Sequence, residues 1–360
     1  MKSKINIIVF LLFIFGFFFV ILFKKDTLIS EDERRYLSTK EDLTLETFSS
    51  NLETYLLDQF PLRSNLRKVK SFSAYHIFNK LENNNVFNYD GSLIKVSTSY
   101  DYSKVDDVIN KINKLRKIMF RKNNCYFVLV PDKINFYDKF TNMTPNYETI
   151  YNKINEKIYK TTMIDIKDSL NLSDYYITDT HWSQDKIKDI SKIILESMGQ
   201  IYEDISYETK EVKDFKGVLL SWSYSLGAKD DIKYLTNEEL ENIKVFNFET
   251  NKESSIYDFE KMNDEKSLDM YDLFLSGPTS LLKITNEKAI SDKTLILFRD
   301  SFGSSIAPLL VHNYKNIYVV DIRYMDSSLL SNFIKVDGTE DVLFLYSTTL
   351  VEMPGNFKIN

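Results

Sequence analysis

The sequence is short of cysteine, glycine and proline, and it has no excess of basic residues. Its single cysteine, Cys125, excludes an internal disulfide and any zinc or iron–sulfur site built from several cysteines. The 9 glycines and 6 prolines among 360 residues are too few for a collagen-like chain or a flexible linker protein. The net charge of −6 argues against a nucleic-acid binder, because binding phosphates requires a basic face.

One long apolar run stands near the start of the chain. Residues 5–23 read INIIVFLLFIFGFFFVILF and contain no charged side chain. A helix of this length spans about 28 Å, close to the roughly 30 Å hydrocarbon core of a bilayer. Lysines flank the run on both sides, and no small-residue cleavage site follows it. We expect residues 1–25 to be an uncleaved signal anchor in the cytoplasmic membrane, with the rest of the chain outside; a cleaved export signal is the alternative.

Beyond the anchor, residues 26–98 have the pattern of a stem of short helices. Apolar residues recur at helical spacing ahead of Pro61, which ends such a run: Leu52, Tyr55, Leu56 and Phe60. The Asp90-Gly91 pair between two short β-prone segments predicts a hairpin over residues 86–96.

From residue 99 onward, apolar segments of helical and strand character alternate. A helix with Ser103 as its N-cap is predicted by one apolar face, made of Val105, Val108, Ile109, Ile112, Leu115 and Met119. A second helix is predicted over residues 183–198, with Gly199 as its stop. Uniformly apolar runs of strand length occur at residues 125–130, 294–298, 317–321 and 342–346. This alternation indicates an α/β domain whose mostly parallel sheet is covered on both faces.

We assign this domain to residues 99–354. Its stretch at about 200–285 is more charged and less periodic than the rest, so we expect an insertion that lies beside the sheet.

A candidate nucleophile follows one of the predicted strands. In open α/β sheets, sites lie at the carboxyl ends of the strands. The strand at residues 294–298 runs into the sequence RDSFGS, and a helix-compatible segment comes next. Ser301 is therefore expected at a strand-to-helix turn, where backbone N–H groups and the helix dipole can stabilise an oxyanion. This position suits a nucleophilic serine, and it equally suits an ordinary N-cap serine.

A nucleophilic serine needs a base, and the chain has three histidines, His76, His181 and His312. We interpret His76, among aromatic residues of the stem, and His312, at the end of the helix after Ser301, as structural. His181 stands just before a predicted helix, and Asp179 precedes it by two residues. In an extended segment, both side chains project to one side, so the carboxylate can hold the ring tautomer and stabilise imidazolium. A solvated surface pair is the alternative.

Two blocks of sequence carry a family resemblance. TDTHWSQD at residues 178–185 and RDSFGSS at residues 299–305, in that order, resemble the SGNH-hydrolase-like family that includes the alginate O-acetyltransferases, known in Gram-positive bacteria as DHHW proteins. Between residues 30 and 350, further matches are SEDERRYLS, LLDQFPLR, LVPDKINFY, YDLFLSGPTS and VVDIRYM. Arg299 stands where the family's serine block usually has glycine, and SGPT at residues 276–279 replaces a loop that often reads Gly-Gly-Asn.

The resemblance implies an SGNH-like three-layer α/β sandwich in which Ser301 is the acyl-accepting nucleophile, His181 the general base and Asp179 the orienting acid. It also implies that Trp182 forms a wall of the site and that Lys133, Tyr137 and Arg323 are possible substrate contacts. Gly277 is a weak candidate for an oxyanion donor. Packing for Trp182, and a surface charge for Lys133 and Arg323, are the simpler alternatives.

The resemblance and the expected tether together favour acetyl transfer to hydroxyls of a secreted or cell-surface polysaccharide, with no cofactor and no metal. The family further implies a partner, a membrane-bound acyltransferase that supplies acetyl across the membrane. An esterase or deacetylase with the same triad is one alternative, because water can replace the sugar. A non-catalytic, membrane-tethered scaffold of polysaccharide export is another, in which Ser301 is a cap and His181 a surface residue.

Overall fold

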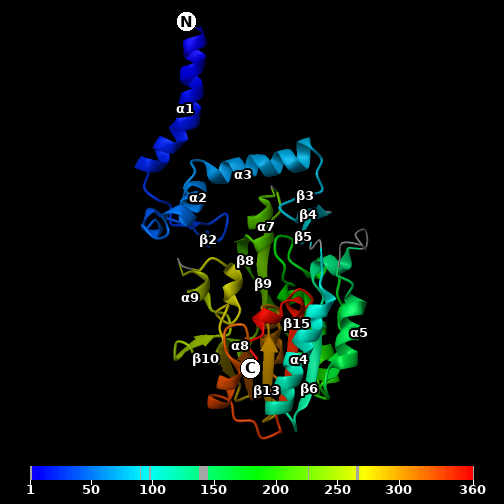
Figure 1. Cartoon of the computed structure of the whole chain (residues 1–360). Helices are drawn as coiled ribbons and strands as arrows, with labels where there is room; N and C mark the ends of the chain where they lie inside the picture. Colours follow the sequence, from blue (N-terminus) through cyan, green and yellow to red (C-terminus); the bar gives the residue numbers. More distant parts are fainter. Residues whose placement is uncertain are drawn as a thin grey trace.

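A computed structural model describes residues 2–89, 91–96, 99–137, 145–225, 227–264 and 267–359. Along the chain, helix α1 (Lys2–Phe23) comes first, then a stem of short elements, then an α/β domain (Figure 1). Within the described residues, one helical segment, Lys4–Phe23, is long and apolar enough to cross a membrane. The expected apolar helix is therefore present, and it projects away from the α/β domain (Figure 1).

The stem combines helices with short strands, whereas the sequence indicated mainly helices. Its elements are β1 (Ile29–Ser30), β2 (Arg35–Tyr36), α2 (Phe48–Asp58), α3 (Arg63–Phe72), the π-helical turn η2 (Ser73–Ile77), β3 (Glu82–Asn83), β4 (Val86–Tyr89) and β5 (Ser92–Lys95). Helix α2 ends ahead of Pro61, as predicted. The predicted hairpin is confirmed, since Tyr89 pairs with Ser92 in the antiparallel β4–β5 ladder.

An eight-stranded sheet forms the centre of the α/β domain, in the order β11-β10-β12-β14-β13-β15-β6-β7. Its strands are β6 (Asn124–Val130), β7 (Thr162–Ile164), β10 (Lys244–Asn247), β11 (Lys252–Ser255), β12 (Leu281–Thr285), β13 (Thr294–Arg299), β14 (Asn316–Val320) and β15 (Asp341–Ser347). The run from β14 to β7 is parallel, and it includes all four strands expected from the apolar segments.

The segment at about 200–285 differs from the expectation. Strands β10, β11 and β12 pair antiparallel and extend the central sheet, so this part of the segment belongs to the sheet instead of lying beside it. Their charged and polar residues fit an outer region of the sheet, which explains why no uniformly apolar pattern marked them. In the described part of this segment, β8 (Glu208–Phe215) and β9 (Asp230–Thr236) form a separate two-stranded antiparallel sheet.

The helices of the domain are α4 (Tyr102–Met119), α5 (Tyr147–Lys157), α6 (Lys188–Ser197), α7 (Val218–Ser223), α8 (Glu238–Asn242), α9 (Phe259–Met262) and α10 (Phe302–Ile306). The predicted N-cap of α4 was wrong by two residues: Asp101 is the cap, and its carboxylate accepts from the Ser103 N–H. Helix α6 begins at Lys188, after a 3-10 turn, and not at residue 183. It ends ahead of Gly199, whose φ of +71° suits a glycine stop.

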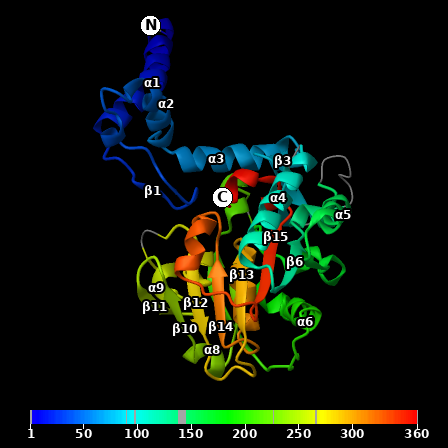
Figure 2. The ribbon, with the colours of Figure 1, turned by 60° about the horizontal axis from the view of Figure 1, so that its bottom comes forward.

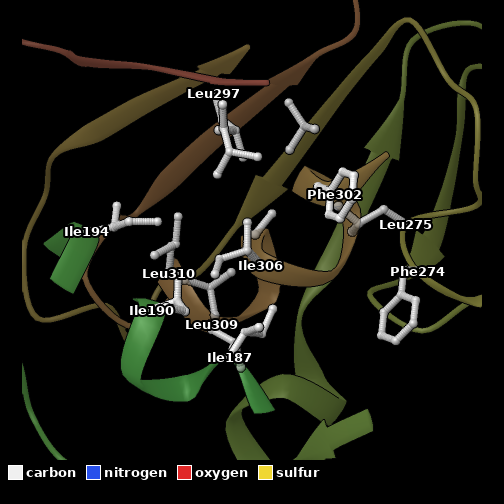
Figure 3. Close-up of a cluster of buried hydrophobic side chains, with 14 of the residues drawn as sticks. Ile187, Ile190, Ile194, Phe274, Leu275, Leu297, Phe302, Ile306, Leu309 and Leu310 are labelled. Atoms are coloured by element: carbon white, nitrogen blue, oxygen red, sulfur yellow. The ribbon is translucent and has the colours of Figure 1, made fainter. Parts of the chain in front are cut away.

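Two apolar layers cover the sheet. Along β13, Leu295 and Leu297 pack into one cluster with α6 and α10, while Ile296 and Phe298 pack into a second cluster with α4 and α5. Figure 3 shows part of the first cluster, where Ile187, Ile190 and Ile194 meet Ile306, Leu309 and Leu310. This is the expected α/β arrangement with both faces covered (Figure 2). It fixes the carboxyl ends of the parallel strands at one edge.

Candidate active site

Ser301 lies at the carboxyl end of β13 and occupies the N-cap position of α10. Its side chain makes no capping hydrogen bond. Instead, Ser301 Oγ lies 2.7 Å from His181 Nε2, across 120 positions of sequence. The sequence left Ser301 as either an N-cap or a nucleophile. The capping hydrogen bond is absent and the hydroxyl contacts a base, so the geometry favours the nucleophile.

His181 and Asp179 lie in a bent loop, so the expectation of an extended segment was wrong. The loop is closed by a single antiparallel bridge between Tyr175 and Trp182. Asp179 Oδ1 accepts from the His181 backbone N–H at 3.1 Å and lies 2.6 Å from His181 Nδ1. The turn itself brings carboxylate and ring together, and the Asp179 side chain is fully buried. Serine, imidazole and carboxylate thus form one continuous hydrogen-bonded chain.

Burial and ion pairing oppose each other at this pair. Burial disfavours the charged ring, but the adjacent Asp179 carboxylate outweighs it and raises the pKa of His181 above its usual value. Burial likewise disfavours a charged Asp179, but His181 and the guanidinium of Arg34 hold the pKa of that carboxyl well below its usual range. Asp179 is therefore ionised, and it stabilises the imidazolium that forms when Ser301 loses its proton.

The second carboxylate oxygen of Asp179, Oδ2, is held by the segment at the start of α7. The Val218 N–H, at the start of α7, donates to Asp179 Oδ2 at 2.8 Å. Gly217 lies so close to the loop that a Cβ there would stand 2.4 Å from the Thr178 carbonyl and 2.5 Å from Asp179 Cβ. Only glycine permits this approach, so residue 217 lets the carboxylate be fixed from both sides.

The stem also reaches the site. Arg34 Nη1 lies 3.6 Å from Asp179 Oδ2, and Nη2 of the same guanidinium pairs with Asp269. Arg34 Nη1 is buried, with no hydrogen-bond partner among the described residues. The positive charge thus acts on Asp179 through space. A segment a few residues after α1 therefore contributes to the electrostatics of the candidate active site.

The histidine block and the serine block are joined by more than the Ser301–His181 contact. Ser305 accepts hydrogen bonds at its hydroxyl from Trp182 Nε1 and from the Tyr271 hydroxyl, both at 2.8 Å. Gln184 Nε2 donates to the Ser305 carbonyl at 2.7 Å. The Tyr271 ring also stacks on the His181 ring, with centroids 4.0 Å apart and planes 10° apart. These contacts hold the imidazole in one orientation facing Ser301.

Ser301 opens into a cleft of about 460 Å³ at the carboxyl edge of the sheet. Its walls come from the stem hairpin, α7, the loop after β6 and the loop after β15; among the lining residues are Asn85, Lys95, Asp132, Trp222, Arg323, Thr349, Glu352 and Asn356. Side chains of both charges, hydroxyls, amides and an indole thus surround the serine. Such a lining suits a ligand rich in hydroxyl groups.

Of the five further candidate residues, Arg323 and Lys133 line the cleft, and the other three do not. Arg323 lines the cleft and is pinned by Asp321, with Nε at 2.8 Å and Nη2 at 2.6 Å from its oxygens. Trp182 is fully buried behind the histidine and does not line the cleft. Tyr137 packs on the stem hairpin, its ring 4.5 Å from that of Tyr89. The Gly277 N–H donates to the Phe274 carbonyl at 3.2 Å, so it already has an acceptor.

Lys133 lies at the cleft, but its ammonium points into the protein. Nζ donates to the carbonyls of Leu93 at 2.5 Å and Tyr176 at 2.7 Å, and Ile177 and Asp179 supply two more carbonyls within 3.2 Å. Burial lowers the pKa of Lys133 to about 7, although Asp179 and Asp230 oppose the shift. Lys133 therefore clamps the stem hairpin to the histidine loop.

The backbone N–H of Ser301 is better placed than that of Gly277 to stabilise an oxyanion. Among the described residues it donates no hydrogen bond, and Ser301 itself lines the cleft. The neighbouring turn is held by Asp300, whose carboxylate accepts from the N–H groups of Phe302 at 3.1 Å and Ser347 at 2.8 Å. Burial raises the pKa of Asp300, while these donors oppose the rise.

Three participants escaped prediction from the sequence: Arg34, Tyr271 and Trp222. Arg34 and Tyr271 stand in segments quoted for the family resemblance, SEDERRYLS and YDLFLSGPTS, so a signal was present without a role attached to it. Trp222 has no such signal, because it lies in the poorly periodic stretch at about 200–285. Within the described residues, no group of three or more His, Cys, Asp or Glu side chains is arranged to hold a metal ion.

No protein-family model and no curated protein matches the chain. Solved structures do match it. A DHHW family protein from Eubacterium siraeum has a TM-score of 0.62 and 20% sequence identity, over 77% of this chain and 95% of that one. This chain has the fold of a DHHW family protein. PatB1 from Bacillus cereus, solved also with a sulfonyl adduct, has a TM-score of 0.60 and 18% identity, over 76% of this chain and 99% of PatB1.

The shared fold confirms the expected α/β class with a mostly parallel sheet. Identities of 18% and 20% describe a shared fold, so the activity has to be argued from the residues of the site.

Proposed function

We propose that this chain is an extracytoplasmic O-acetyltransferase that moves an acetyl group to hydroxyls of a secreted or cell-surface polysaccharide. The observation that carries the proposal is the pair of hydrogen-bond contacts that connects the three side chains. Ser301 Oγ lies 2.7 Å from His181 Nε2, and His181 Nδ1 lies 2.6 Å from Asp179 Oδ1. Ser301 itself lines a cleft. A serine with a base and an orienting carboxylate in hydrogen-bond reach is the arrangement that nucleophilic acyl transfer requires.

The reaction follows from the atoms of the site. His181 Nε2 takes the Ser301 proton, Ser301 Oγ attacks the acyl carbonyl, and the imidazolium returns the proton to the leaving group. Asp179 accepts from Nδ1–H throughout and stabilises the charged ring. The Ser301 N–H faces the oxyanion of the tetrahedral intermediate. A sugar hydroxyl, deprotonated by His181, then attacks the acyl-enzyme; the bond between the acetyl carbon and Ser301 Oγ breaks, and the imidazolium returns the proton to Ser301 Oγ.

The cleft supports a carbohydrate acceptor. Trp222 presents a partly exposed indole, with Lys95 Nζ 4.8 Å above its ring, and an aromatic face of this kind stacks on the apolar face of a sugar ring. Arg323 and Glu352 contribute a donor and an acceptor for hydroxyls. Water as acceptor would make the chain an esterase, so the acceptor decides between the two activities.

Helix α1 supports the location of this activity. A single span would tether the domain at the outer face of the cytoplasmic membrane, where exported polymers emerge. The acetyl group then has to cross the membrane, and a membrane-bound acyltransferase is the partner whose chemistry supplies it. A cleaved signal would place the same domain outside without the tether.

The decisive experiment gives purified full-length protein a soluble acetyl ester together with an oligosaccharide acceptor. We expect acetylated sugar from the wild type and neither acetyl-sugar nor released acetate from Ser301→Ala. Acetate without acetyl-sugar would identify an esterase. A fluorophosphonate that labels wild type and Ser301→Ala equally, or labels neither, would overturn catalysis and leave the scaffold interpretation.

A further inference from the structure

Helix α3 exposes its apolar side, in contrast to a surface helix of a soluble protein. Soluble proteins bury the apolar side of such a helix and expose its polar side. In α3 and the adjoining turn η2, an outer apolar face stays uncovered; it consists of Leu62, Leu66, Val69, Phe72 and Ile77. Leu62 is 65% exposed, Val69 61% and Ile77 61%.

The inner side of α3 is polar and charged. Arg67 pairs with Glu33 at 3.0 Å, and its guanidinium lies 4.4 Å from the centre of the Tyr224 ring. Lys68 pairs with Asp32 at 2.9 Å. Ser71, on the same side, is fully buried. The polar side of α3 therefore packs on the stem and on α7, which leaves the apolar side facing outward.

The outer apolar face lies on the side of α3 opposite its contacts with the stem and α7. Figures 1 and 2 show α3 lying crosswise to α1, on the end of the molecule nearest α1. The segment between α2 and α3 contacts α1, because the Phe60 ring lies 5.1 Å from the Phe17 ring. Lys40 Nζ also bonds the carbonyls of Leu22 and Lys24 at the end of α1. In both views α3 lies near the end of α1 that leads into the stem, so a membrane spanned by α1 would have its surface close to α3.

The charge of this segment fits a lipid surface. Residues 62–80 contain five basic and no acidic residues; Arg63, Arg67 and Lys68 pair with Glu33 or Asp32 of the stem, while Lys70 and Lys80 make no ion pair among the described residues. An amphipathic helix with basic residues and an exposed apolar side is the type that lies in the interface between headgroups and acyl chains. Lys70 and Lys80 are therefore the cations that anionic phospholipid headgroups would attract.

We propose that the outer apolar face of α3 lies in the headgroup region of the membrane and docks the domain onto the bilayer. The inference rests on the proposed membrane anchoring by α1. Directly beneath α3, Asn84 Nδ2 donates to the Trp222 carbonyl and Asn83 Nδ2 to the Ser223 carbonyl. The cleft, which Trp222 lines, is thereby held beside the membrane surface. Docking would therefore fix the orientation of the cleft relative to a membrane-embedded acetyl donor.

The test attaches an environment-sensitive fluorophore to Leu66→Cys or Val69→Cys in the full-length chain, reconstituted in nanodiscs of phosphatidylcholine and phosphatidylglycerol with brominated acyl chains. The native Cys125 is buried, so the wild type reports any labelling outside the new position. Lys288→Cys, in the loop before β13 at the far end of the domain, is the matched control. We expect blue-shifted, bromine-quenched emission at positions 66 and 69 and neither effect at 288.

Water-like, unquenched emission at positions 66 and 69 would overturn the proposal. An apolar emission without bromine quenching would also overturn it, because a second copy of the chain would then cover the face. The double variant Leu66→Glu/Val69→Glu adds an independent readout: acetyl transfer from a membrane-embedded donor should fall about tenfold or more, with fluorophosphonate labelling unchanged. Equal transfer would contradict docking.

The two proposals fail separately. Ser301→Ala should leave the quenching intact, because docking uses no catalytic group. Quenching without any fluorophosphonate labelling of the wild type would refute the acyl-transfer proposal alone. A chain that does not co-purify with the nanodiscs would refute the anchoring on which docking rests.

Discussion

Trp182 Nε1 donates to Ser305 Oγ at 2.8 Å, and this bond ties together two blocks of sequence that lie 123 positions apart. It is buried, and the same hydroxyl accepts from Tyr271. Trp182 directly follows His181, and Ser305 stands one helical turn after Ser301. The bond therefore sets the distance between base and nucleophile, although neither partner touches the cleft.

Ser305→Ala should destabilise the protein and slow acylation. The variant leaves the Trp182 indole N–H and the Tyr271 hydroxyl buried without an acceptor, which costs about 2 to 4 kcal/mol in total. Chemical denaturation measures the free energy of unfolding, and fluorophosphonate labelling measures the rate. Ser304→Ala is the control, because the Ser304 hydroxyl receives neither donor. Equal stability of the two variants would show that the junction is dispensable.

The pH dependence of labelling should reflect the raised pKa of His181. The ring acts as a base only when neutral, so the rate falls as the pH drops through its pKa. Since Asp179 raises that pKa, the acid limb of the wild type should lie above pH 6.5, the ordinary histidine value. Asp179→Asn should lower the rate by about 10³-fold or more and move the limb to lower pH. An unchanged profile would remove Asp179 from the mechanism.

Gly217→Ala tests whether the close approach of α7 positions Asp179. The added Cβ meets backbone atoms at 2.4 Å, so the loop has to move, and we expect a loss of about 1 to 3 kcal/mol in stability. The labelling rate should fall about tenfold or more, because the Val218 N–H moves away from Asp179. Gly355→Ala, where a Cβ meets nothing within 4 Å, should behave as the wild type.

Arg34→Gln should change the pH profile, which a purely structural role would not do. Removing a positive charge 3.6 Å from Asp179 makes the histidine ring easier to protonate, so the acid limb should move to higher pH. Arg34→Lys keeps a positive charge, so it should bring the acid limb part of the way back to the wild-type pH. The control is Arg35→Gln, since Arg35 pairs with Asp58 and Glu33 away from the site. The same limb in all three variants would contradict an electrostatic role.

Trp222→Ala should separate acceptor binding from acylation. If the indole stacks on a sugar ring, the KM for an oligosaccharide acceptor should rise about tenfold, while the fluorophosphonate labelling rate stays the same. Tyr159→Ala removes an exposed aromatic outside the cleft and should change neither value. Slower labelling in Trp222→Ala would assign the indole to the shape of the site instead of the acceptor.

Local patterns in the sequence were enough to predict the elements that bury apolar residues. Four of the five parallel strands, the buried face of α4, the β4–β5 hairpin and the apolar helix α1 each depend on residues close together in the chain. Ser301 was predictable for the same reason, because a strand followed by a short turn and a helix is written in neighbouring residues. The pairing with His181 needed the family resemblance and the elimination of two other histidines.

What only the tertiary structure decided are the contacts between polar segments far apart in sequence. The charge of Arg34 reaches Asp179, and β10 to β12 complete the sheet, through packing that no local periodicity records. The orientation of α3 belongs to the same class. Its sequence specifies an apolar and a polar side, but only the tertiary structure shows that the polar side packs inward, because its partners Asp32, Glu33 and Tyr224 come from segments that are distant in the sequence.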